Sequence, residues 1–141
     1  MNGGPGGYSM GVAPDVQLTM TAAIHARWAH RVDGLIHSHP WSLEATVEGP
    51  ADAEKVIPAD ELERILHELV EPWRGRYLTN EDVGEWKGYT PLVWDREPTV
   101  EEIARRLWSQ LEHQVDGLVS VGVGESTEFD RCRTVRVSRV R

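Results

Sequence analysis

A strict alternation of apolar and polar residues from Pro40 to Glu48 limits the folds open to this chain more than any other feature. The apolar positions are Trp41, Leu43, Ala45 and Val47. The positions between them carry Ser42, Glu44, Thr46 and Glu48. Because successive side chains of a strand point to opposite faces, this pattern predicts a strand with one buried face. Such a strand needs partners in a sheet and a layer that covers its apolar face.

The segment from Gln17 to His30 has a similar alternation and predicts a second strand. Its apolar positions are Leu18, Met20, Ala22, Ile24 and Trp28. We expect the two strands to pair in an antiparallel manner through the loop Arg31 to Ile36. That arrangement places His30 across the hairpin from His37.

Two segments carry apolar residues at helical spacing. From Asp60 to Glu71 the apolar residues are Leu62, Ile65, Leu66 and Leu69, and Pro72 ends the helix. After the N-cap Thr99 they are Val100, Ile103, Ala104, Leu107 and Leu111, and this helix ends near Gly117. The intervening stretch from Trp73 to Glu97 shows no sustained period, so we expect a long ordered loop of the kind that is often functional.

Two further strands are expected. The segment Leu118 to Val123 alternates apolar with small residues, and Arg133 to Arg141 is rich in valine with alternating arginines. The predicted order is ββααββ, an α+β fold with a four-stranded antiparallel sheet and two helices on one face. The other face and the edges of that sheet need cover, so we expect a homo-oligomer. Residues 1–16 are expected to form a flexible glycine-rich tail, and residues 17–141 a single domain.

Composition excludes several classes of partner. The formal net charge is -8, which disfavours both nucleic acid and anionic membrane surfaces. Cys132 is the single cysteine, so no disulfide can form within the chain. No apolar stretch reaches the roughly 20 residues of a membrane-spanning helix, and the first residues do not resemble a signal peptide. We therefore expect a soluble, cytoplasmic protein.

Three histidines are placed to bind one metal ion. His37 and His39 leave the same face of a strand, and the hairpin brings His30 beside them. Three neutral imidazoles with a vacant fourth position are typical of a catalytic zinc. The alternative is a set of ordinary imidazoles near a turn. The remaining histidines fit no ligand spacing: His25, His67 and His113.

At this point the chain resembles the 6-pyruvoyl-tetrahydropterin synthase family, which includes the 6-carboxy-tetrahydropterin synthases. The similar segments are Ala29-His30, His37-Ser38-His39-Pro40-Trp41, Arg76-Tyr77-Leu78-Thr79-Asn80, Pro98-Thr99-Val100-Glu101 and Glu125-Ser126. The resemblance implies a tunnelling fold that assembles as an oligomeric barrel, a trimer or a hexamer, with active sites at subunit interfaces. It also implies Zn²⁺ as the cofactor and a pterin-like small molecule as the substrate.

The chain departs from the family pattern at two places. Asp33 stands where the family synthases carry a cysteine, and Arg74 and Gly75 stand where they carry Asp-His. A divergent member without these groups is expected to catalyse an altered reaction. Asp33 is the candidate general base, since desolvation can raise the pKa of a carboxylate, but Asp-Gly is also a common turn pair.

Four residues are candidates for substrate binding. The resemblance implies that the Glu125 carboxylate grips the pterin ring, and two hydrogen bonds from an amidine-like edge would suit it; a solvated strand-end carboxylate is the alternative. Thr99 and Glu101 belong to the similar segment before the second helix, although cap and first-turn roles also explain them. Arg74 could bind a carboxylate or phosphate, or simply be solvated.

These observations favour a zinc-dependent lyase-like enzyme acting on a pterin or a related bicyclic substrate. The chemistry would be elimination, retro-aldol cleavage or carbon–carbon bond formation in a specialised pathway. The alternative is a catalytically inactive homologue that binds zinc and a pterin. A hydrolase based on Ser38 is disfavoured, because strand alternation points Ser38 away from both neighbouring histidines.

Overall fold

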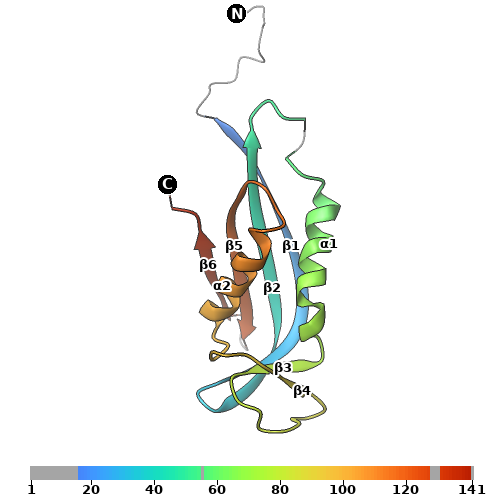
Figure 1. Cartoon of the computed structure of the whole chain (residues 1–141), viewed down its shortest axis with the longest axis vertical. Helices are drawn as coiled ribbons and strands as arrows, with labels where there is room; N and C mark the ends of the chain where they lie inside the picture. Colours follow the sequence, from blue (N-terminus) through green and yellow to red (C-terminus); the bar gives the residue numbers. More distant parts are fainter. Residues whose placement is uncertain (1–15, 55, 128–130, 141) are drawn as a thin grey trace, which may run out of the picture.

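The computed structural model describes residues 16–54, 56–127 and 131–140, without the side chains of 126, 127, 131 and 132. Within these residues, six strands form one sheet in the order β4-β3-β1-β2-β5-β6 (Figure 1). The strands are β1 Gln17–Val32, β2 Leu35–Pro50, β3 Arg76–Thr79, β4 Thr90–Val93, β5 Leu118–Thr127 and β6 Arg131–Ser138. The helices are α1 Ala59–Val70, the short 3-10 helix η1 Glu71–Trp73 and α2 Val100–Leu111. Of the predicted glycine-rich tail, residues 1–15 lie outside the described residues.

The long hairpin of β1 and β2 is confirmed, with a tighter turn than expected. His30 pairs directly with His37, and Val32 pairs with Leu35. Only Asp33 and Gly34 lie between the strands, with φ of 54° and 78°. Two successive positive φ angles are typical of a type I′ turn, in which Asp-Gly is a favoured pair. The predicted loop from Arg31 to Ile36 is therefore wrong in length, because both strands continue almost to the turn.

The predicted four-stranded antiparallel sheet is wrong in its strand number and in its order of elements. The segment expected to be a loop contributes β3, which is parallel to β1, and β4, which is parallel to β3. Each has four residues, and Tyr77, Leu78 and Thr79 are all buried. A strand that is buried on both faces, such as β3, shows no alternation, and the four residues of β4 are too few to establish one.

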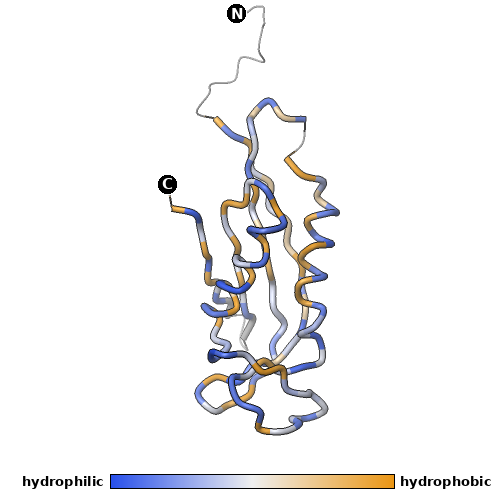
Figure 2. Tube along the Cα trace, viewed as in Figure 1, coloured by the Kyte–Doolittle hydropathy of each residue, from blue (hydrophilic) through white to orange (hydrophobic). Residues whose placement is uncertain are grey.

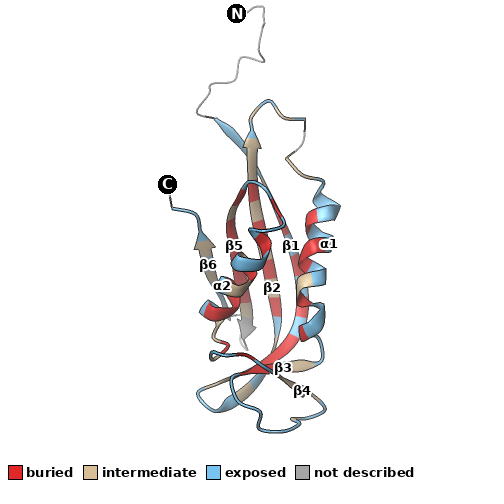
Figure 3. Ribbon diagram, in the orientation of Figure 1, coloured by how far each residue is buried: buried red, intermediate tan, exposed pale blue. Residues whose placement is uncertain are grey.

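Both helices pack against the same face of the sheet, as predicted (Figure 1). Apolar and polar residues alternate as α1 turns, and its buried residues face the sheet (Figures 2 and 3). The core joins α1 residues such as Leu66 and α2 residues such as Leu107 to Leu43 of β2 and Val123 of β5. Within the described residues, no helix is long and apolar enough to span a lipid bilayer.

Contacts between tryptophan rings connect the β1–β2 hairpin to η1 and to the residue that follows β4. Trp28 and Trp41 stack with ring centroids 4.7 Å apart, Trp73 meets Trp28 edge-on at 5.1 Å, and Trp94 meets Trp73 at 5.6 Å. Thus two of the three tryptophans in the segment predicted as a loop belong to the core. The third, Trp86, is half-buried and contacts Tyr89.

Candidate metal centre

Two of the predicted ligands, His30 and His39, meet Glu125 on the helix-covered face of the sheet. The Nε2 atoms of His30 and His39 lie 3.9 Å and 3.7 Å from Oε2 of Glu125. The ligand atoms of these three residues all lie within 4.8 Å of one another. Strand pairing explains this convergence. Trp28 pairs with His39, so His30, two residues after Trp28, lies on the same face of the sheet as His39. Trp41, two residues after His39, pairs with Glu125, which places Glu125 on that face as well.

The His30 side chain is held in the form that a metal requires. It is buried, and its Nδ1 atom lies 2.8 Å from the carbonyl oxygen of Pro98. Since a carbonyl oxygen only accepts, Nδ1–H donates and Nε2 keeps its lone pair for the site. Burial lowers the pKa of His30 below 6.5, although the hydrogen bond to Pro98 opposes this shift. The ring is therefore neutral at pH 7.

His37 lies at the edge of the same cluster. Its ring centroid is 6.3 Å from that of His30 and 5.8 Å from that of His39, and its side chain is exposed. It does not belong to the group of ligand atoms that meet at Glu125. The structure therefore adds Glu125 as a candidate ligand, while the assignment of His37 stays a prediction.

The donor set suits zinc. Two imidazole nitrogens and a carboxylate oxygen are zinc ligands in catalytic centres, which leave a position for water or substrate. Zinc–ligand bonds of about 2.1 Å in a tetrahedron place the ligand atoms about 3.4 Å apart. The separations of 3.9 Å and 3.7 Å are close to that value. His30, His39 and Glu125 therefore fit Zn²⁺.

These residues line a cavity of about 490 Å³. Its other lining residues are Val32, Asp33, Leu35, His37, Thr99, Val100, Glu101 and Arg133. The volume is within the range of small-molecule sites. Most of the polar lining residues are candidates predicted from the sequence, whereas the sequence pattern places Arg133 only on a terminal strand.

Asp33 lies at the mouth of this cavity, at the tip of the hairpin. It is exposed, and its backbone N–H donates to Oε2 of Glu97 at 2.9 Å. Glu97 precedes α2, so this bond ties the turn to the start of the helix. The turn geometry accounts for an Asp at this position, whether or not the carboxylate also acts on a substrate.

Thr99 and Glu101 enter the cavity from the N-terminus of α2. The Thr99 hydroxyl accepts a hydrogen bond from the N–H of Glu102 at 3.1 Å, as an N-cap does. Thr99 is half-buried and Glu101 is exposed. Both candidates thus line the cavity, and Thr99 also has the structural role that the sequence suggested.

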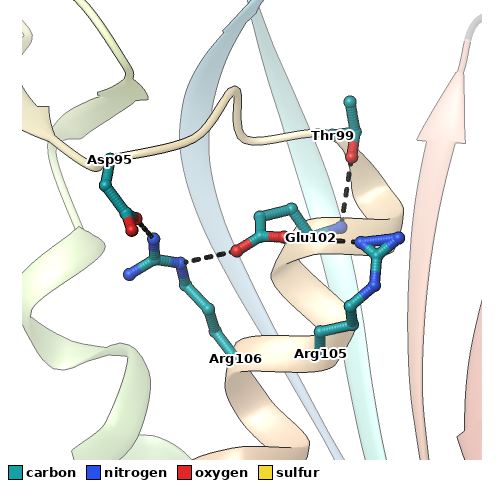
Figure 4. A network of polar contacts seen from close by, with 5 residues as sticks. All are labelled: Asp95, Thr99, Glu102, Arg105 and Arg106. Atoms are coloured by element: carbon teal, nitrogen blue, oxygen red, sulfur yellow. Dashed lines mark hydrogen bonds and ion pairs between the residues drawn. The ribbon is translucent and has the colours of Figure 1, made fainter.

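A network of charged side chains fixes the segment before α2 (Figure 4). The buried carboxylate of Glu102 accepts from Nε of Arg106 at 3.1 Å and from Arg105 at 3.4 Å. Arg106 also pairs with Asp95, and its guanidinium lies 4.1 Å from the ring centroid of Trp94. The network therefore anchors both ends of the segment that presents the Pro98 carbonyl to His30.

Arg74 is not in the cavity of this chain. Its guanidinium lies 3.0 Å from Nδ1 of His67 and 3.2 Å from the carboxylate of Glu71. The Ser38 hydroxyl, as the alternation predicted, lies apart from the histidines and contacts Tyr89 at 3.1 Å and Arg27 at 3.4 Å.

Comparison with solved structures identifies relatives of the same fold. An uncharacterized protein from Wolinella succinogenes aligns with a TM-score of 0.69 and 15% identity over 89% of this chain and 99% of its own. The Caenorhabditis elegans 6-pyruvoyl tetrahydropterin synthase aligns with a TM-score of 0.63 and 16% identity over 92% and 100%. The Plasmodium falciparum 6-pyruvoyl tetrahydropterin synthase aligns with a TM-score of 0.61 and 14% identity over 87% of this chain and 99% of its own.

No curated protein sequence matches the chain significantly. The sequence model of 6-pyruvoyl tetrahydropterin synthase, however, matches residues 18–138, nearly the whole described part of the chain. The predicted α+β class is confirmed by the same match and by the solved structures. The chain belongs to the 6-pyruvoyl tetrahydropterin synthase family.

Proposed function

We propose that this protein is a zinc-dependent lyase-like enzyme that acts on a pterin or a related bicyclic molecule. The observation that carries the proposal is the convergence of His30, His39 and Glu125 in a cavity of about 490 Å³. Family membership gives this cavity its expected ligand, a pterin. The proposed reaction is an elimination, a retro-aldol cleavage or the formation of a carbon–carbon bond.

Five of the lining residues have a proposed task. His30 and His39 hold the metal with Glu125 or His37 as a third ligand, and a bound zinc would polarise oxygens of the substrate side chain. Glu125, when it is not a ligand, accepts hydrogen bonds from the N–H and amino groups of the ring. Asp33 takes up the proton that is released from the substrate.

A carboxylate as the catalytic group has support among the relatives. Two Plasmodium vivax 6-pyruvoyltetrahydropterin synthase structures are described as mutants of a catalytic glutamate. A carboxylate can therefore serve as a catalytic residue within this fold. Asp33 is, with Glu101, one of two exposed carboxylates that line the cavity in this chain.

The direct experiment is to incubate the zinc-loaded protein with dihydroneopterin triphosphate and related pterins and to look for products by mass spectrometry. Turnover that is lost in Asp33→Asn, with zinc content and circular dichroism unchanged, would support the proposal. A rate that is unchanged in Asp33→Asn would remove Asp33 from the mechanism. Absence of any turnover would contradict the proposal that the protein is an enzyme.

A catalytically inactive zinc- and pterin-binding protein is the second candidate. The observation that favours it is the exposed position of Asp33 in a turn that explains the residue without catalysis. Tight binding of a pterin without product would support this candidate.

We propose that the protein assembles as a homo-oligomer, a trimer or a hexamer. The support comes from family membership and from the sheet, in which, among the residues that the structure describes, the outer strands β4 and β6 each pair on one side only. In such an assembly, Arg74 of a neighbouring copy could reach the cavity that it does not reach in its own chain. Light scattering after size-exclusion chromatography gives the mass, and a monomer would contradict this proposal.

A further inference from the structure

Arg133 lines the cavity, and none of the roles proposed above involves it. On β6, Val135 and Val137 pack against the core, so every second residue faces the helices. Arg133 follows the same alternation and lines the cavity. Its strand partner is Glu125, the residue directly opposite on β5.

The Arg133 guanidinium has no ion-pair partner within the described part of the chain. Although Glu125 is its strand neighbour, the Glu125 carboxylate points to His30 and His39. Arg136 provides a contrast on the other face of the same strand, since it forms an ion pair with Glu44. Arg133 thus brings to the cavity a positive charge that no described carboxylate neutralises by direct contact.

The N-terminus of α2 forms another wall of the same cavity. Val100 and Glu101 line it, and no acceptor for their backbone N–H groups is found among the described residues. The start of a helix also carries a partial positive charge, which favours anions. The carboxylates of Asp33 and Glu101 are exposed and would repel an anion from their own side of the cavity.

We propose that Arg133 binds an anionic oxygen group of the substrate, a carboxylate or a phosphate, and so selects anionic over neutral ligands. This inference rests on the proposed function for the identity of the ring. A guanidinium suits such groups because it can form two parallel hydrogen bonds to their oxygens.

The test compares matched ligands that share a ring. One pair is 6-carboxypterin and 6-methylpterin; the other is dihydroneopterin triphosphate and dihydroneopterin. Equilibrium dialysis with zinc-loaded protein measures the dissociation constants for the native chain, Arg133→Gln, Arg133→Lys and the control Arg136→Gln. Arg133→Gln should weaken one of the two anionic ligands roughly tenfold to a hundredfold, as loss of a charged hydrogen bond does.

The neutral ligands should change less than about threefold, as should all ligands in Arg136→Gln, and Arg133→Lys should recover part of the loss. The pair that responds identifies the group as carboxylate or phosphate. Equal weakening of anionic and neutral ligands, or no weakening at all, would overturn the inference.

Inorganic pyrophosphate, which lacks the ring, separates this inference from the proposed function. If no pterin binds to the native protein but pyrophosphate binds more weakly to Arg133→Gln than to Arg136→Gln, the pterin proposal fails and the anion site stands. If pterins bind without discrimination by charge in all four proteins, the pterin site stands and the role of Arg133 is refuted.

Discussion

Zinc should raise the free energy of unfolding of this protein, and the increase should be that expected for one binding site per chain. For one site per chain, each tenfold rise in free zinc above the dissociation constant adds about 1.4 kcal/mol to the free energy of unfolding. With an unfolding entropy of about 2.1 cal/mol/K per residue, the 141 residues give roughly 0.3 kcal/mol/K. The melting temperature should therefore rise by about 5 °C for every tenfold rise in zinc.

Differential scanning calorimetry on metal-free protein in zinc buffers measures this slope. His39→Ala should abolish it, because His39 belongs to both candidate ligand sets. Mg²⁺ should have no effect, since imidazole nitrogens are poor ligands for it. A native protein whose melting temperature does not respond to zinc would refute the metal centre, and a slope twice as steep would show a second site.

Three further predictions concern the surroundings of the site. Arg106→Met should weaken zinc binding roughly tenfold by releasing the segment that holds the Pro98 carbonyl, whereas Arg105→Met, which changes a largely exposed side chain, should not; competition with a zinc chelator measures both. Gly117→Ala should lower the free energy of unfolding by about 2 kcal/mol or more in urea titrations, because Gly117 has a φ of 77° and a Cβ would collide with the Glu48 carbonyl. Acidification below pH 6.5 should destabilise the metal-free protein, because the unfolded chain then binds a proton that folded His30, with its pKa lowered by burial, does not; urea midpoints should depend less on pH in His30→Gln.

The alternating strands and the amphipathic helices could be predicted because their pattern follows from one-sided burial. The segment from Pro40 to Glu48 lies within β2, and α1 was located to within one residue at each end. The helix α2 begins after Thr99 as expected, but it ends at Leu111, well before the predicted end near Gly117. The strands β3 and β4 could not be found in this way, because each has only four residues and three of the four in β3 are buried. The tertiary fold determines which strands they pair with, and a local sequence pattern carries no information about that pairing.

The site was predictable where it depends on strand geometry. The pairing of His30 with His37 follows from the hairpin, and the candidates Asp33 and Thr99 both line the cavity, while their roles there stay predictions. Arg133 could not be recognised, because its position opposite Glu125 depends on the register of β6 with β5. An alternation of arginine and valine indicates a strand, but it does not indicate what lies across from it.

The identity of the third metal ligand decides how a substrate can bind. If Oε2 of Glu125 binds the metal, that carboxylate cannot offer both oxygens to the N–H and amino groups of a pterin ring, and another carboxylate of the lining must do so. If His37 binds the metal, Glu125 stays available for the ring, with only 12% of its side chain exposed. Zinc content and pterin affinity in His37→Ala and Glu125→Gln separate these arrangements. Loss of zinc in His37→Ala with loss of pterin binding alone in Glu125→Gln supports three histidine ligands, whereas loss of zinc in Glu125→Gln but not in His37→Ala supports the carboxylate as a ligand.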